Sequence, residues 1–221
     1  MEIRNVMPAE EPAAEKVVSA AFGEPPDGRV VQMMRALQTS GAARASLVAV
    51  VDEELVGHVG LSRGWVDARR ELVDVMVLSP LSVRPDRQRH GIGTALVAAA
   101  LETAGDRGAP AVFLEGSPDY YGRRGFSSAS ALGFYRPSTR IPDPGFQVAL
   151  LSSYQPWMVG RLIYPEAFWT TDTVGLRDPE LERVEAQVAS GPTGGERREA
   201  DGMQDLAHRV AVPPSTKPGT R

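Results

Sequence analysis

The chain contains no cysteine, and this absence removes several functional classes at once. Disulfide bonds, thiolate metal sites and a cysteine nucleophile are all excluded. Histidine is also scarce: His58, His90 and His208 lie far apart and match no metal-ligand spacing, so we predict no metal. No apolar run approaches the ~20 residues that span a bilayer, so no membrane partner is expected.

Charge of either sign is moderate. The 28 acidic residues exceed the 24 basic ones, and the net charge of −4 argues against a general nucleic-acid binder. The opening stretch MEIRNVMPAEEPAAEK lacks the apolar core of an export signal, so we expect a cytoplasmic protein. A length of 221 residues suits one domain with an extension. The oligomeric state is left open between monomer and homodimer.

Hydrophobic periodicity divides the chain into helices and strands that indicate a mixed α/β sheet. We expect helices over residues 9–22, 27–40, 91–108, 118–125 and 177–190, and strands over 2–6, 45–52, 54–66, 72–83, 109–117, 126–134 and 145–151. Residues 45–83 read as three successive strands in a meander. The aromatic and apolar segment after Leu151 is expected to pack on the domain, and the Gly- and Pro-rich stretch from Ser190 onward reads as a disordered tail.

Pro80 stands inside the third strand of this meander. Proline cannot donate a hydrogen bond to a ladder and is tolerated only at edges or bulges. We therefore expect the residues after it, "LSV", to have unpaired backbone groups, although a simple edge bulge is an equal alternative.

A glycine motif, "QRHGIG" (Gln88–Gly93), opens the helix expected over 91–108. It lacks the lysine of a phosphate-binding Walker A loop, and Leu96 stands where a dinucleotide-binding fingerprint needs its third glycine. It does fit Q/R-x-x-G-x-G/A. Small residues let an anion approach the first helical amides, which have no internal partners, and the helix dipole favours negative charge there. The alternative is an ordinary turn with a solvated basic face.

Two segments together resemble the GNAT superfamily of acetyl-CoA-dependent N-acetyltransferases, and its YhbS-like branch most closely. They are "LSPLSVRPDRQRHGIGTALV" and "LEGSPDYYGRRGF", and "GRLIYPEAFW" is similar to that branch's closing segment. The resemblance covers roughly residues 1–170. It implies a mostly antiparallel central sheet flanked by helices. Beyond the part that it covers, the residue pattern itself indicates a helical extension over 171–189 and a disordered tail over 190–221.

The resemblance also implies where the cofactor binds. The family's strand before the loop pairs with the pantetheine arm of acetyl-CoA, and the loop holds its pyrophosphate. The corresponding strand residues are Leu81, Ser82 and Val83, and the corresponding loop residues are Gln88, Arg89, His90, Gly91, Ile92, Gly93 and Thr94.

Tyr121 matches the tyrosine of the family pattern Tyr-x-x-x-Gly-Phe, which implies a general acid that protonates the leaving thiolate. A phenol of pKa ~10 can donate to a thiolate whose thiol has a pKa of ~8.5. The alternative is that Tyr120 or Tyr121 is a packing aromatic. The family's glutamate on the strand before the loop is absent here. Glu115 is the nearest candidate base, with a surface carboxylate as the alternative, and His58 and Glu24 are weaker candidates.

The sequence thus predicts acetyl transfer from acetyl-CoA to a primary amine by direct attack in a ternary complex. A non-catalytic acyl-CoA-binding sensor is the second hypothesis, and a dinucleotide-dependent oxidoreductase is a poorer third. The acceptor amine is not identified. Residues 20–34 and the segment Tyr154–Trp169 are expected to shape its pocket, and Glu24 and Asp27 hint at a cationic acceptor.

Overall fold

A computed structural model describes residues 1–175 of the chain. Eight strands in this part form one sheet in the order β1-β2-β3-β4-β5-β7-β6, and β8 pairs with β3. The strands are β1 (Glu2–Asn5), β2 (Ala43–Val51), β3 (Glu54–Ala68), β4 (Leu72–Val83), β5 (Ala111–Glu115), β6 (Ser127–Ser128), β7 (Phe146–Leu150) and β8 (Gly160–Ile163). The helices are α1 (Glu11–Phe22), α2 (Arg29–Thr39), α3 (Ile92–Asp106), α4 (Pro118–Tyr121) and α5 (Glu166–Thr170).

The sheet is mixed and mostly antiparallel, as the sequence predicted. Only the β4–β5 pair is parallel within the described residues, because α3 crosses over between these two strands. The β2–β3–β4 meander is confirmed. Its first turn uses Asp52 and Glu53, both with positive φ (50° and 65°), which is the two-residue hairpin turn that matches the twist of the strands.

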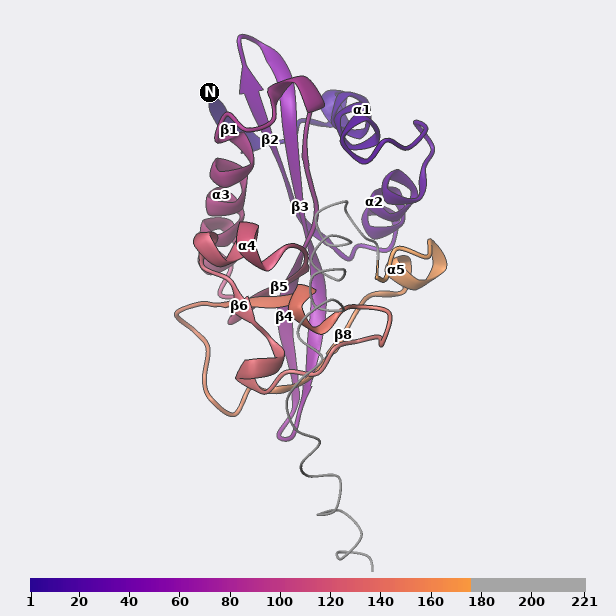
Figure 1. The fold of residues 1–221 in the computed structure, drawn as a ribbon. Helices are drawn as coiled ribbons and strands as arrows, with labels where there is room; N and C mark the ends of the chain where they lie inside the picture. Colours follow the sequence, from indigo (N-terminus) through magenta and orange to yellow (C-terminus); the bar gives the residue numbers. More distant parts are fainter. Residues whose placement is uncertain (176–221) are drawn as a thin grey trace, which may run out of the picture.

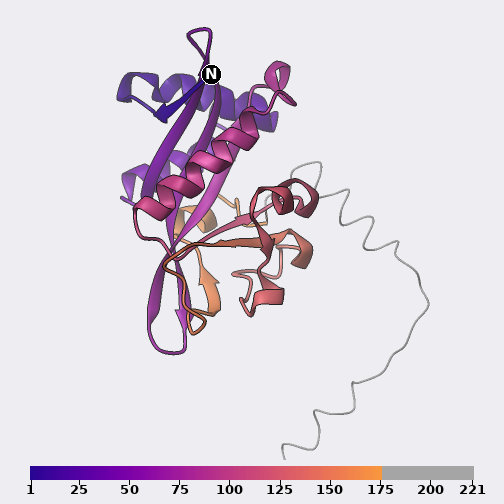
Figure 2. The same cartoon turned by 90° about the vertical axis from the view of Figure 1, so that its left-hand side faces the viewer.

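The helices cover the two faces of the sheet. Helices α1 and α2 lie on one face and α3 on the other (Figures 1 and 2). Each face has its own core: Val18, Val31 and Met33 pack with Phe113 on the first face, whereas Leu96 of α3 packs against β3 on the second. In α3, for example, the buried residues Leu96, Ala100 and Ala104 recur every four positions, so the helix buries one apolar stripe.

Strands β4 and β5 separate shortly after they meet. They pair only at Met76–Val112 and Val77–Phe113, while β4 continues to Val83 on the β3 side. The rest of β4 therefore presents an open edge toward β5. The expectation from Pro80 was only half right: residues 81–83 keep their pairing with β3, and the ladder shifts register between Val59 and Leu61, opposite the proline.

The structure corrects one sequence expectation and adds two elements that the sequence did not predict. The strand predicted over 126–134 is reduced to β6, because most of that stretch turns: residues 130–132 form a short 3-10 helix between two glycines with positive φ, Gly125 (88°) and Gly133 (87°). Strand β8 and helix α5 were not predicted at all. The helix expected over 177–190 and the tail from Ser190 lie outside the described residues.

Two absences expected from the sequence are reported for the described part of the chain alone. No helix there has the length and apolar character needed to cross a membrane. No cluster of three or more histidine or acidic side chains within residues 1–175 could hold a metal ion.

Candidate active site

Two cavities lie along the open edge of β4 and meet there. We call them the inner cavity, of about 480 Å³, and the outer cavity, of about 810 Å³. Both are lined by Leu81, Val83, Gln88 and Tyr121. Because the pairing of β4 and β5 ends at Val77, the gap between the two strands leaves room for these cavities.

The outer cavity is bounded by the start of α3 and by α4. Helix α3 begins after Gly91, whose φ of 83° is left-handed and therefore suits glycine. Within the described residues, the amides of residues 89–94 find no hydrogen-bond acceptor, and the first helical turn directs them outward. Arg89 and Arg123 also line this cavity, and neither forms an ion pair in the described part. The arrangement suits an anion.

Contacts across the outer cavity hold α4 against the α3 start. The Arg124 guanidinium lies 3.6 Å from the centre of the Tyr120 ring and donates to Thr94 Oγ1 at 2.6 Å. The hydroxyl of Tyr120 occupies the space where a side chain on Gly93 would project. A larger residue at position 93 would displace the Tyr120 hydroxyl from this contact.

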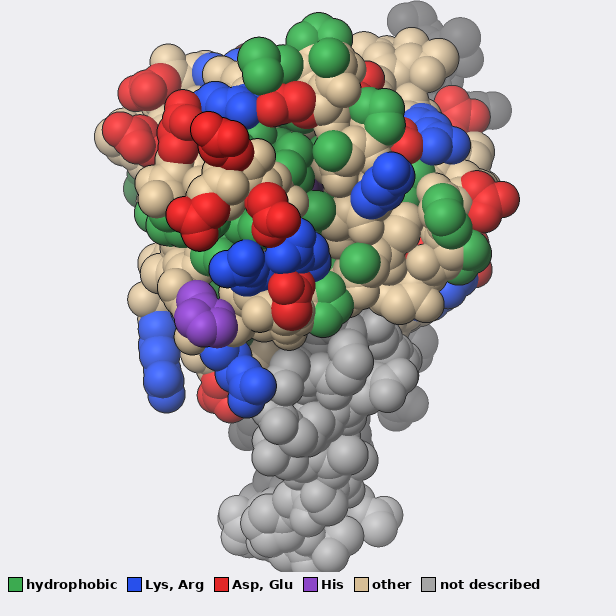
Figure 3. All heavy atoms as spheres, turned by 90° about the horizontal axis from the view of Figure 1, so that it is seen from above, with side chains coloured by type: hydrophobic (Ala, Val, Ile, Leu, Met, Phe, Trp, Pro, Cys, Tyr) green, Lys and Arg blue, Asp and Glu red, His purple; other side chains and the backbone are tan. Residues whose placement is uncertain are grey.

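The arginines on the other side of the loop are largely neutralised. Arg84 donates to Asp86 (2.7 Å) and to Glu54 (3.1 Å), and Arg87 lies 3.5 Å from Glu54. Figure 3, which views the molecule from above, shows basic and acidic side chains interspersed beside a histidine on that face. The positive charge available to a ligand therefore comes from the cavity side of the loop.

The cofactor residues predicted from the sequence fall into two groups. Gln88 bridges the loop to β4, since its Nε2 donates to the Val83 carbonyl at 3.1 Å, and His90 Nδ1 donates to the Gln88 carbonyl at 2.7 Å. Leu81, Val83, Gln88, Arg89 and Thr94 line one or both cavities, whereas Ser82, His90, Gly91, Ile92 and Gly93 line neither. Ser82 and Ile92 are buried.

Tyr121 lies where the two cavities meet. It is 9% exposed and makes edge-on contacts with the rings of Tyr120 (4.9 Å between centroids) and Phe126 (5.7 Å). Gly116 allows this position, because a Cβ there would collide with the Tyr121 ring. The backbone at the end of β5 therefore fixes the tyrosine at the junction.

Glu115, the last residue of β5, lines the inner cavity. Its Oε1 accepts a hydrogen bond from the Tyr164 hydroxyl at 3.0 Å, and its Oε2 accepts one from the Gly175 amide at 3.0 Å. Enclosure by the protein raises the pKa of Glu115 to about 7, although these two hydrogen bonds and the charge of Arg140 act in the opposite direction. Such a carboxyl group can gain or lose a proton near neutral pH.

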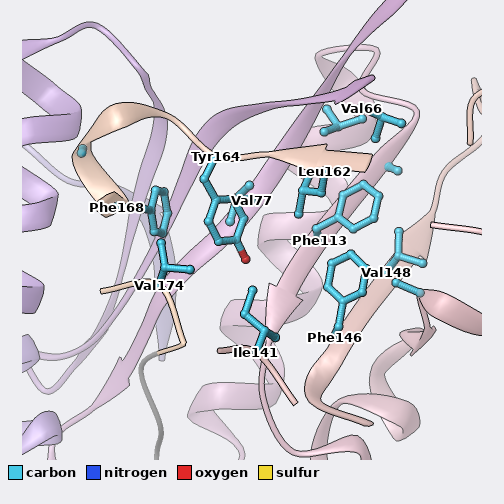
Figure 4. Close-up of a cluster of buried hydrophobic side chains, with 14 of the residues drawn as sticks. Val66, Val77, Phe113, Ile141, Phe146, Val148, Leu162, Tyr164, Phe168 and Val174 are labelled. Atoms are coloured by element: carbon cyan, nitrogen blue, oxygen red, sulfur yellow. The ribbon is translucent and has the colours of Figure 1, made fainter. Parts of the chain in front are cut away.

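The sequence did not single out the aromatic residues of the inner cavity. Tyr164 and Phe168 stack with ring centroids 4.6 Å apart (Figure 4), and Phe22 at the end of α1 lines the same space. The segment Tyr154–Trp169 was expected to shape a pocket, and it does so through Tyr164 and Phe168. The helix pair contributes only the end of α1.

The weaker acid–base candidates lie elsewhere. His58 is 1% exposed, lines neither of the two cavities, and has a pKa lowered to about 4 by burial, so it is a neutral core residue. Glu24 Oε2 accepts from the Val30 amide at 3.1 Å and thereby ties the loop to the start of α2. Neither Glu24 nor Asp27 lines the inner cavity, so the position of these two residues does not support the expectation of a cationic acceptor.

This geometry agrees with the protein family to which the chain is similar. Residues 14–126, just over half of the chain, match the Acetyltransferase (GNAT) family. The chain belongs to this family and is an N-acetyltransferase. Within the family it falls in the YhbS-like branch.

Two sequence relatives come from Escherichia coli strain K12. The uncharacterised N-acetyltransferase YjhQ is 29% identical over 129 residues, covering 58% of this chain and 70% of YjhQ. The uncharacterised N-acetyltransferase YhbS is 28% identical over 131 residues, covering 59% of this chain and 75% of YhbS.

Two solved structures share the fold. The crystal structure of E. coli YhbS in complex with CoA superposes with a TM-score of 0.68 at 25% identity, covering 76% of this chain and 91% of that one. A GNAT family acetyltransferase from Brucella melitensis in complex with acetyl-CoA has a TM-score of 0.60 at 27% identity, covering 76% and 97%.

Proposed function

We propose that this chain transfers the acetyl group of acetyl-CoA to a primary amine by direct attack in a ternary complex. The observation that carries the proposal is the meeting of two cavities at the open edge of β4, with Tyr121 at the junction. The CoA and acetyl-CoA complexes of the two structural relatives support this choice of donor. The proposed catalytic domain is residues 1–170.

The outer cavity takes the donor in this proposal. The amides of residues 89–94 and the cations Arg89 and Arg123 favour a pyrophosphate. The edge of β4 at residues 81–83 offers backbone groups to the amides of the pantetheine arm, in the way that a strand is added to a sheet. The thioester then reaches the junction.

The inner cavity takes the acceptor. Glu115 removes a proton from the ammonium group, and the free amine forms a bond to the acetyl carbon. The carbon–sulfur bond breaks, the thiolate takes a proton from the Tyr121 phenol, and the surplus proton on the product nitrogen restores that phenol. Rate enhancement comes chiefly from positioning and from polarisation of the carbonyl by a backbone amide. The chain has no cysteine, so no acetylated cysteine forms.

Titration calorimetry with acetyl-CoA, combined with a thiol-release assay over a panel of primary amines, tests this proposal. We expect binding and turnover in the wild type. Tyr121→Phe should lower kcat by ~10²- to 10⁴-fold with nearly unchanged affinity for acetyl-CoA, because only the proton donor is lost. Tyr135→Phe, at an exposed tyrosine outside both cavities, is the matched control.

The outcomes are separable. Unchanged turnover in Tyr121→Phe would remove the general-acid role. Binding of acetyl-CoA without turnover of any amine would favour the sensor hypothesis instead. An absence of binding would contradict both.

A further inference from the structure

The wall of the inner cavity carries very little charge. Among the described residues that line it, Glu115 alone carries a charge. The remaining wall is uncharged: it combines apolar and aromatic side chains such as Phe22, Leu78 and Phe168 with the neutral polar side chains of Ser79, Gln88 and Thr173. Its lining contains no arginine, lysine or second carboxylate from residues 1–175.

This wall discriminates between amines by their other charges. An acceptor with several ammonium groups would find one carboxylate on the described wall, and its other ammonium groups would be enclosed without a counter-charge, which is strongly disfavoured. An amino acid would bring its own carboxylate close to Glu115, with no cation on the described wall to offset the repulsion. A single ammonium group on an uncharged body avoids both costs.

Aromatic side chains from two distant segments line the cavity. Phe168 and Tyr164 form a stacked pair with an interplanar angle of 27°, and Phe22 comes from the end of α1 and packs against the same core cluster. Tyr164 also holds Glu115 through its hydroxyl. The same residues thus orient the carboxylate and provide ring faces for an apolar ligand.

We propose that the acceptor is a primary monoamine with an uncharged, aromatic or branched apolar body. This inference rests on the acetyl transfer proposed above and narrows its substrate class. The amine would meet Glu115, and the body of the molecule would pack between Phe22 and the Tyr164–Phe168 pair.

Thiol release with the full chain and acetyl-CoA tests the inference on amines that differ in the number and sign of their charges. We expect kcat/KM for 2-phenylethylamine to exceed that for spermidine or kanamycin at least ten-fold. Phenylalanine and phenylalaninamide form a sharper pair, because they differ in the carboxylate. The amide should be acetylated at least ten-fold more efficiently.

A charged side chain introduced into the wall of the inner cavity should change the preference for monoamines. Phe22→Asp should lower kcat/KM for 2-phenylethylamine at least ten-fold and raise it for 1,5-diaminopentane, because a second carboxylate can pair the second ammonium group. Phe22 is half-buried at the end of α1, so the change is tolerable for folding, and circular dichroism verifies this. Leu132→Asp, at an exposed residue outside the cavity, is the matched control.

Failure of this inference differs from failure of the proposed function. If the wild type binds acetyl-CoA but prefers spermidine, kanamycin or phenylalanine, the monoamine assignment is overturned and acetyl transfer stands. If Phe22→Asp leaves the ratio of the two kcat/KM values unchanged, Phe22 does not contact the acceptor and the assignment also falls. An absence of acetyl-CoA binding or of turnover with every amine contradicts the proposed function itself.

Discussion

At Glu115, burial and hydrogen bonding change the pKa in opposite directions. Removal from water raises the pKa, whereas the hydroxyl of Tyr164, the amide of Gly175 and the charge of Arg140 lower it. The net result is a rise from the usual 4.5 to about 7. A base with this pKa is about half ionised at neutral pH, close to the value that general-base catalysis favours.

The pH dependence of the rate follows from this pKa. Only the ionised form of Glu115 can accept the ammonium proton, so kcat/KM should rise with pH through a midpoint near 7. Glu115→Gln should abolish this limb and lower kcat by ~10²- to 10⁴-fold. Thiol release measured from pH 5 to 9 provides the profile. Glu166→Gln, an exposed glutamate outside both cavities, should keep the wild-type profile.

Glu115 should also affect how the stability of the domain depends on pH, and this effect can be measured without turnover. A carboxyl whose pKa is raised in the folded state binds its proton more tightly there than in the unfolded chain. Its contribution to stability is therefore full below pH 4.5 and is lost as pH rises through about 7. Wild type should lose this stability over that window and Glu115→Gln should not. Identical pH profiles of the midpoint temperature would contradict the raised pKa.

Among the secondary-structure elements, those with a strong local signal were predicted and those that depend on distant partners were not. The helix expected over 91–108 is α3, because a run dense in Ala and Leu forms a helix in almost any context. The four residues of β8 carry no comparable signal. They become a strand because the far end of β3, at Trp65–Ala68, supplies the hydrogen-bond partners.

The packing of α3 on the sheet can be tested by replacing each of two glycines, Gly57 and Gly105, with alanine. A Cβ at Gly57 on β3 would lie 2.8 Å from Leu96 Cδ1, a buried side chain of α3, and 3.3 Å from the Ala49 Cβ. Gly57→Ala should therefore lower the free energy of unfolding by ~1–3 kcal/mol through overpacking.

Gly105 in α3 gives the opposite expectation. No atom lies within 4 Å of a Cβ at this exposed position, and alanine restricts the unfolded chain more than glycine does. Gly105→Ala should raise the free energy of unfolding by ~0.5–1 kcal/mol. Urea titration of both variants measures the two effects. A gain in stability from Gly57→Ala would show that α3 does not pack closely on β3.

At the scale of the whole molecule, the two cavities differ in how far the sequence could reveal them. The anion-binding edge of the outer cavity lies in one contiguous stretch, residues 88–94, and its glycines mark it. The inner cavity combines the end of α1, the second half of β4, Gln88, the end of β5, Tyr121 of α4 and residues around α5. Only the fold brings these segments together, so the sequence could indicate the regions around Phe22 and Phe168 but not that these two side chains line one cavity with Glu115.

Because the outer cavity is built by the folded chain, ligand binding should stabilise the whole domain. A ligand present at a hundred times its Kd adds ~2.7 kcal/mol to the free energy of unfolding, which for a domain of this size raises Tm by about 5–10 °C. We expect this shift with acetyl-CoA and with CoA, since the pyrophosphate and pantetheine are common to both.

Gly93→Val should remove most of the ligand-induced rise in Tm, because the added side chain projects into the space of the Tyr120 hydroxyl beside the helix start. Gly105→Val, the same substitution at an open position of the same helix, should keep the shift. Equal shifts in the two variants, measured by thermal denaturation against ligand concentration, would mean that the start of α3 does not hold the cofactor.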